Sequence, residues 1–130
     1  MTTDLWMLIA STLLCLLLPS VYGVGRSQAP GGLQWSLGNR DTSLTVTAWT
    51  DRAVRAHLNM MENLAPFAIL VLTAHVAGKA NAMTALGSVI FFLGRLAHAI
   101  VYVAGITVVR TLVFFVSVVG EVIILVQLFR

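Results

Sequence analysis

Four long apolar stretches, separated by more polar segments, dominate the chain. They run from about residue 5 to 24, 52 to 77, 83 to 104 and 108 to 129. Each is near or above the roughly 20 residues that a helix needs to cross a hydrocarbon core of about 30 Å. Strand-like alternation is absent, and a helix satisfies its own backbone hydrogen bonds in lipid. The pattern predicts an all-α integral membrane protein with four transmembrane helices.

The connections predict how these helices are arranged. Residues 78–81 and 105–107 form tight turns, so the helices that they join should run antiparallel. The expected fold is a four-helix bundle in a single domain, 1–130. Residues 25–51, which contain Gly, Pro, Ser and Asn, should form a long irregular loop.

The first stretch has an alternative interpretation as a signal peptide. Its leading segment MTTD carries an acid and no basic residue, whereas a signal peptide begins with positive charge. We therefore expect a retained membrane helix, kinked near its end by Pro19.

Composition agrees with a lipid environment and argues against several kinds of site. Hydrophobic residues make up 58% and charged residues 10% of the chain, against about 25% charged in soluble domains. The net charge of +3 comes from scattered residues, so no nucleic-acid surface is expected. A single cysteine excludes a disulfide framework within the chain and a cysteine-ligated metal site.

Basic residues predict the orientation in the membrane. The side with the long loop has five and the opposite side two, which places the loop in the cytoplasm and both termini outside it. The compact connections favour a bacterial inner membrane. The first group is Arg26, Arg40, Arg52, Arg55 and Arg110, and the second is Lys79 and Arg130.

Polar side chains form two stripes at helical spacing within the apolar stretches. Ionisable residues inside a span are costly, so they are functional candidates by default. In the second stretch, positions i, i+4 and i+7 share one helical face, with Arg52 a turn earlier; in the third stretch, positions i, i+3 and i+7 do so. The stripes are Arg55, Asn59 and Glu62, and Arg95, His98 and Tyr102.

Counting residues gives these side chains a depth. Glu62 and Arg95 both lie about ten residues, or roughly 15 Å, from the cytoplasmic ends of their stretches. Their depths predict an ion pair on the floor of a polar groove that opens to the cytoplasm beside Arg110. A Glu–Arg pair can alternatively serve only to fix helix register.

The remaining ionisable residues suggest no second site. Glu121 lies deep in the fourth stretch without a stripe and should be structural, pairing with a buried arginine such as Arg95. His75 should be interfacial. His57, His75 and His98 share neither a face nor a depth, so a metal site is not expected.

Arginines, an amide, one carboxylate and a phenol suit a small ligand that bears carboxylates and an ammonium. Arg110, at the start of a helix, is placed to stabilise an anion such as a thiolate. Because the lone Cys15 lies in an apolar run, such a thiol would belong to the substrate.

Two segments resemble a known family. RAVRAHLNMMENLAPF, residues 52–67, resembles the second-helix signature of the MAPEG superfamily, membrane-associated proteins in eicosanoid and glutathione metabolism. GRLAHAIVY, residues 94–102, resembles the third-helix signature of its microsomal prostaglandin E synthase branch, which stands beside the microsomal glutathione transferases. The resemblance implies a homotrimer that binds glutathione between adjacent subunits and takes a hydrophobic small-molecule substrate from the bilayer.

The resemblance also implies roles for individual residues. Arg110 would stabilise the glutathione thiolate, with the Thr111 hydroxyl beside it. Leu58 and the eight-residue step from Tyr102 to Arg110 depart from the prostaglandin synthase pattern. The implied glutathione ligands are Arg55, Asn59, Glu62, Arg95, His98 and Tyr102, with Arg52 and Arg26 as further basic residues.

The expected function is a glutathione-dependent transferase or peroxidase that acts on lipophilic electrophiles. One alternative is a non-catalytic, lipid- or anion-binding membrane scaffold of the same fold. Another is that the groove binds a different anionic metabolite or a lipid headgroup. Retention of the implied ligand set favours the glutathione-dependent enzyme over both alternatives.

Overall fold

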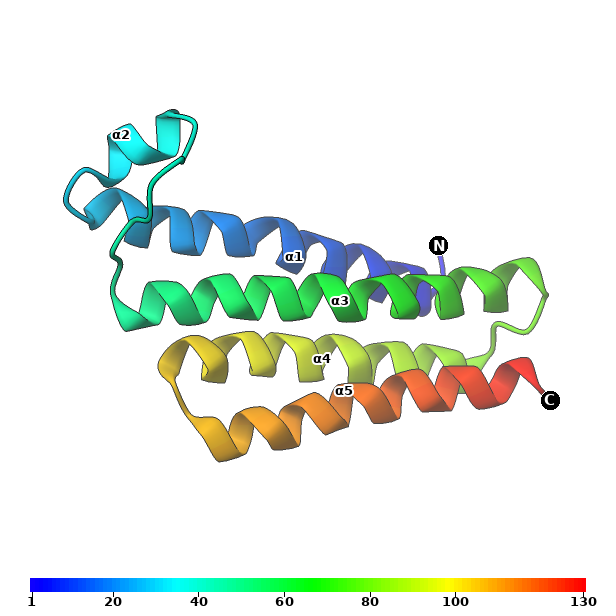
Figure 1. The fold of residues 1–130 in the computed structure, drawn as a ribbon. Coiled ribbons are helices and arrows are strands. Elements are labelled where there is room, and N and C mark those ends of the chain that lie inside the picture. Colours follow the sequence, from blue (N-terminus) through cyan, green and yellow to red (C-terminus); the bar gives the residue numbers. More distant parts are fainter.

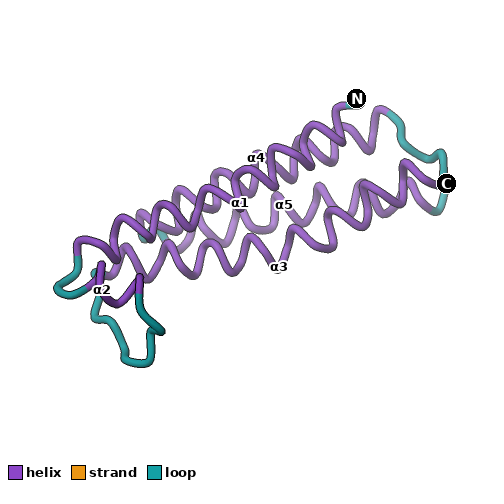
Figure 2. The backbone as a smooth tube through the Cα atoms, turned by 90° about the horizontal axis from the view of Figure 1, so that it is seen from above, coloured by secondary structure: helices purple, strands orange, loops and turns teal.

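The computed structural model describes residues 1–130, and every regular element in it is a helix (Figure 2). Four long helices lie alongside one another and alternate in direction, so that both termini lie at the same end (Figure 1). The all-α prediction is confirmed. The helices are α1 (Thr3–Gln28), α2 (Gly32–Leu37), α3 (Ala48–Val76), α4 (Ala82–Ala104) and α5 (Thr107–Leu128).

Three of these helices, α1, α4 and α5, are long and apolar enough to cross a membrane. At 29 residues α3 has the length, but polar side chains in its first half, from Asp51 to Asn63, lower its hydropathy. A crossing by α3 stays a prediction.

The loop between α1 and α3 departs from the predicted bounds and from the predicted irregular structure. The first helix continues through Pro19 to Gln28, and residues 32–37 form the short helix α2, which projects from one end of the bundle (Figure 1). The Arg26 guanidinium lies 4.6 Å from the ring centre of Tyr22 and 5.3 Å from that of Trp35. These cation–π contacts join the end of α1 to α2.

The closest helix contact is between α4 and α5, where small residues let the backbones approach. A Cβ atom added to Gly120 would lie 2.5 Å from the carbonyl oxygen of Gly87. One added to Gly94 would lie 2.9 Å from the backbone nitrogen of Ser117. Both distances are too short for real atoms, so these glycines fix how α4 and α5 are rotated against each other.

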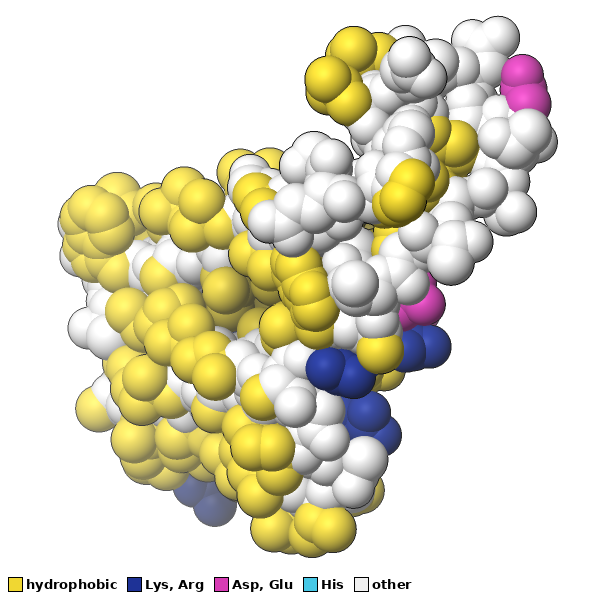
Figure 3. Space-filling view, turned by 90° about the vertical axis from the view of Figure 1, so that its left-hand side faces the viewer, with side chains coloured by type: hydrophobic (Ala, Val, Ile, Leu, Met, Phe, Trp, Pro, Cys, Tyr) yellow, Lys and Arg dark blue, Asp and Glu magenta, His cyan; other side chains and the backbone are white.

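Apolar side chains fill the interior and also cover much of the outside. Phe67 of α3 and Phe91 of α4 stack at 3.8 Å between ring centres in the main core cluster. Outward-facing side chains such as Leu16 (66% exposed) and Ile69 (65%) remain apolar. Figure 3 looks onto the end that carries α2: basic side chains gather beside the loop, and apolar ones cover most of the bundle. This exterior suits lipid.

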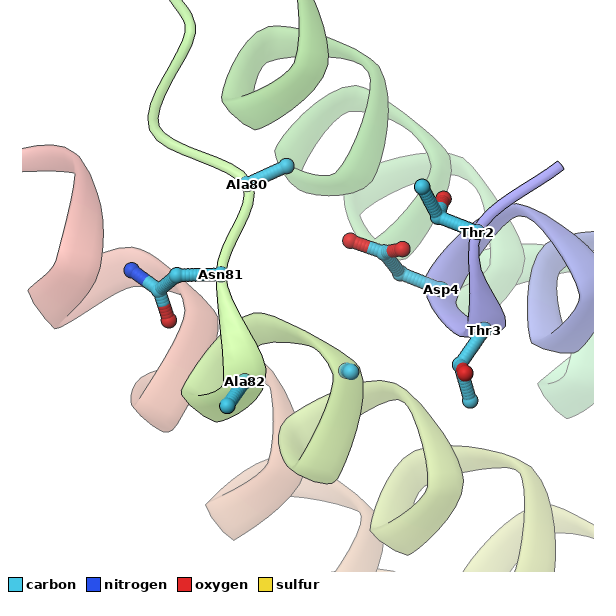
Figure 4. A pocket seen from close by; sticks show the side chains of 7 residues that line it. Thr2, Thr3, Asp4, Ala80, Asn81 and Ala82 are labelled. Carbon is cyan, nitrogen blue, oxygen red and sulfur yellow. The ribbon is translucent and has the colours of Figure 1, made fainter.

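At the opposite end, a buried carboxylate joins three helices. Asp4, 2% exposed, lies at the start of α1 and borders a cavity of about 300 Å³ with Asn81 (Figure 4). Its Oδ2 accepts a hydrogen bond from the Thr84 hydroxyl at 3.0 Å and lies 3.1 Å from His75 Nε2. His75, which was predicted at the membrane–water interface, lies at the end of the bundle and contacts Asp4.

Asp4→Ala should lower the free energy of unfolding by about 2–3 kcal/mol, because it leaves the buried Thr84 hydroxyl without its charged acceptor. The measurement is denaturation of the purified protein in detergent. Asp51→Ala is the matched control, since Asp51 is also an acid in the first turn of its helix but is exposed. Equal losses in the two variants would contradict this role for Asp4.

Candidate functional site

A cavity of about 330 Å³ opens near the turn between α4 and α5, at the end of the bundle that carries α2. It combines side chains from α3, α4 and α5. Five of its seven lining residues were predicted from the sequence. The lining residues are Asn59, His98, Tyr102, Arg110, Thr111, Phe114 and Phe115.

Aromatic contacts link the side chains at the opening of this pocket. The Arg110 guanidinium lies 4.5 Å from the ring centre of Tyr102, a cation–π distance. The Tyr102 ring in turn meets His98 edge to face, with ring centres 5.3 Å apart. Because Arg110 makes no ion pair with an acid of this chain, its charge is available to an anionic ligand.

Arg95 does not line the cavity itself but bonds to its lining residue Asn59, and we call this buried guanidinium the floor of the pocket. Arg95 is 1% exposed, and its Nη2 donates a hydrogen bond of 2.6 Å to Asn59 Oδ1, which joins α4 to α3. The Nε and Nη1 groups of Arg95 are buried without a partner, as is Nδ1 of His98. Buried polar groups are normally hydrogen-bonded. These unpaired groups therefore mark the floor as a place for further polar contacts.

The predicted ion pair between Glu62 and Arg95 is wrong. Glu62 is exposed on α3, and Arg95 bonds to Asn59 instead. Three residues turn an α-helix by about 300° and advance it by about 4.5 Å, so Glu62 points about 60° away from Asn59 and lies almost one turn further along α3. Only Asn59 faces α4.

Five predicted ligands do not line the pocket within one chain: Arg95 lies behind Asn59, and the other four lie elsewhere. Arg55 and Glu62 are exposed on α3, and Arg26 stacks on Tyr22 and Trp35. Arg52 donates from Nε to the carbonyl of Val103 at 2.9 Å, near the end of α4. Arg52 thus joins α3 to an exposed helix terminus, a structural contact.

Phe114 and Phe115 line the pocket but were missed. Phe114 packs 6.1 Å from His98 between ring centres, and Phe115 is 59% exposed. Their positions four and five residues after Arg110, about one helical turn, were the available signal. Thr111 lies beside Arg110 as expected, and its hydroxyl donates to the Thr107 carbonyl at 3.3 Å.

Comparison with known proteins places this geometry in context. A family model described as the MAPEG family matches residues 4–130. Prostaglandin E synthase from Canis lupus familiaris is 33% identical over 72 residues, which cover 55% of this chain and 42% of the relative. Prostaglandin E synthase from Equus caballus gives the same identity and coverage. The match thus covers less than half of the length of each relative.

Proposed function

Because the chain belongs to the MAPEG family and is an integral membrane protein, we propose that it is a glutathione-dependent transferase or peroxidase for lipophilic electrophiles. The observation that carries this proposal is the pocket in which Asn59, His98, Tyr102 and Arg110 meet above the buried Arg95. A basic pocket of this kind fits an acidic thiol peptide.

The residues of the pocket divide into binding and activating groups. Asn59, with the free donors of Arg95, would hold a carboxylate or peptide group of glutathione. The guanidinium of Arg110 would stabilise a thiolate and so increase the reactive fraction at neutral pH. The Thr111 hydroxyl lies at the mouth and would have to exchange its bond to the Thr107 carbonyl for one to the ligand. When bound, glutathione supplies the sulfur nucleophile.

The substrate would approach from the membrane. The aromatic wall of Phe114 and Phe115 joins the polar pocket to the apolar exterior of α5, where Leu112 is 61% exposed. A lipophilic electrophile dissolved in the bilayer can thus reach the thiolate without entering water. The rate enhancement would come from proximity and electrostatic stabilisation.

The exposed polar face of α3 supports a homotrimer in which all four long helices cross the membrane. Arg55 and Glu62 lie on the outside of a single chain, where lipid contact would be costly. A second subunit would cover them and let them contact glutathione at the interface. The excess of arginines near α2 supports a cytoplasmic loop and both termini outside, in a bacterial inner membrane.

A non-catalytic lipid-binding scaffold is the second candidate. It is favoured by an entirely apolar cavity of about 330 Å³ between α1 and α4. The cavity is open to an acyl chain and has no group for thiol chemistry. Its lining residues are Leu14, Leu18, Val21, Leu96, Ala99, Ile100 and Val103.

Glutathione should raise the thermal midpoint of the purified protein in detergent. At ten times Kd, one bound ligand adds about 1.4 kcal/mol to the free energy of unfolding. S-methylglutathione should also bind, but only glutathione should react with a lipophilic aryl halide such as a chlorodinitrobenzene. Binding without turnover of aryl halides or hydroperoxides would favour the scaffold. No stabilisation by glutathione at millimolar concentration would contradict the proposed function.

A further inference from the structure

Glu121 is a half-buried acid that the pocket does not account for. It lies within α5, about 10 Å from the C-terminal end of that helix at 1.5 Å per residue. Its Oε1 is buried without a hydrogen-bond partner. A carboxylate inside an apolar span is costly unless an opposite charge balances it.

The packing of α4 against α5 brings such a charge near. Gly94 contacts Ser117 across the interface, Arg95 follows Gly94, and Glu121 lies one turn after Ser117. The two helices run in opposite directions (Figure 1). Because side chains tilt toward the start of their own helix, Arg95 and Glu121 converge on the same section of the interface.

Glu121 is the only acid in α4 and α5, so it is the one carboxylate of these two helices that can balance the charge of Arg95. Their charged atoms do not form a direct ion pair. The guanidinium has donors to spare, because only its Nη2 is engaged, by Asn59.

We propose that Glu121 is a positioning residue whose carboxylate balances the buried charge of Arg95 and so holds the Arg95–Asn59 hydrogen bond on the pocket floor. This inference rests on the proposed function where it takes Asn59 as a ligand of glutathione. The sequence predicted that Glu121 pairs with a buried arginine such as Arg95; the structure shows no direct ion pair, and the proposal gives Glu121 the balancing role that was predicted for Glu62. With the floor neutralised in this way, the net positive charge that a ligand meets at the pocket comes from Arg110.

A double-mutant cycle in thermal unfolding tests the pair without glutathione. Glu121→Gln keeps the shape of the side chain and removes its charge, so it should lower the midpoint by about 5 °C. In an Arg95→Met background, the Glu121 carboxylate has no opposite charge, so the same change should raise the midpoint instead of lowering it. Equal shifts in the two backgrounds would overturn the proposal, whether or not glutathione binds.

Glutathione affinity separates positioning from stability alone. Glu121→Gln should raise the Kd for glutathione about tenfold, a coupling of about 1.4 kcal/mol, and Glu121→Asp should restore part of the affinity. The control is Gln127→Ala. Gln127 is also a buried polar residue of α5, and it bonds to Asn81 at the far end of the bundle. Gln127→Ala should lower the thermal midpoint and leave the Kd for glutathione unchanged.

The possible failures are distinguishable. An unchanged Kd in Glu121→Gln, together with wild-type binding of glutathione, overturns the positioning role. If the wild-type protein does not bind glutathione, the proposed function fails, and the double-mutant cycle alone decides whether Glu121 holds Arg95.

Discussion

Arg110→Ala should lower glutathione-dependent turnover by about 10²- to 10³-fold, while glutathione still binds. This is the loss expected when one preorganised group that stabilises a developing or stored anion is removed. Arg95 and Asn59 lie on the pocket floor and do not depend on Arg110, so binding is expected to persist. Steady-state kinetics with a chlorodinitrobenzene, together with titration calorimetry of glutathione, would separate the two effects.

The chain offers a matched control for this substitution. Arg40 also places its guanidinium over an aromatic ring, 5.5 Å from the centre of Trp35, but it lies in the loop away from the pocket. Arg40→Ala should leave turnover unchanged. Arg110→Lys should recover only part of the activity, because a lysine keeps the charge but not the planar set of donors. Full turnover in Arg110→Ala would rule out its assigned role.

The sequence can predict which residues of one helix share a face, but not how that helix is rotated against its neighbours. Helical periodicity predicted polar stripes that contain Asn59 and His98, and the structure brings both into the same cavity. Their rotation about the helix axes comes from packing. Contacts between helices, such as the stacking of Phe67 of α3 on Phe91 of α4, set that rotation, and no periodicity within one helix contains them. The predicted Glu62–Arg95 pair failed because Arg95 bonds to Asn59, three residues before Glu62, while Glu62 is exposed.

Contacts among segments far apart in the chain were also beyond prediction. Asp4 reads in the sequence as an acid at the start of a helix, which is favourable there by itself. Its burial against Thr84 and His75 follows only once three helices have packed side by side. The same holds for Arg52, whose contact with the end of α4 removed it from the pocket.

Whether lipid or a second subunit covers the outward face of α3 can be tested with Glu62→Leu. Glu62 lies near the middle of the 29-residue helix and is exposed in a single chain. If lipid covered it, replacing the charge with leucine would stabilise the protein, since a charged residue at the centre of a span costs about 2.5–3.5 kcal/mol or more. If a second subunit and glutathione cover it, the loss of the carboxylate should be harmful.

We expect the harmful outcome: glutathione affinity at least tenfold weaker, because truncating one partner of a buried charge pair typically costs about 2–5 kcal/mol. Met61→Leu, at an exposed apolar neighbour, should leave the affinity unchanged. Native mass spectrometry of both variants would show whether the oligomer survives. A Glu62→Leu protein that is more stable and still binds glutathione would place this face of α3 in lipid. The sign of the stability change in Glu62→Leu thus decides between a lipid-facing helix and a subunit interface. A carboxylate in contact with lipid destabilises the protein, whereas one that a partner subunit covers can bind a ligand.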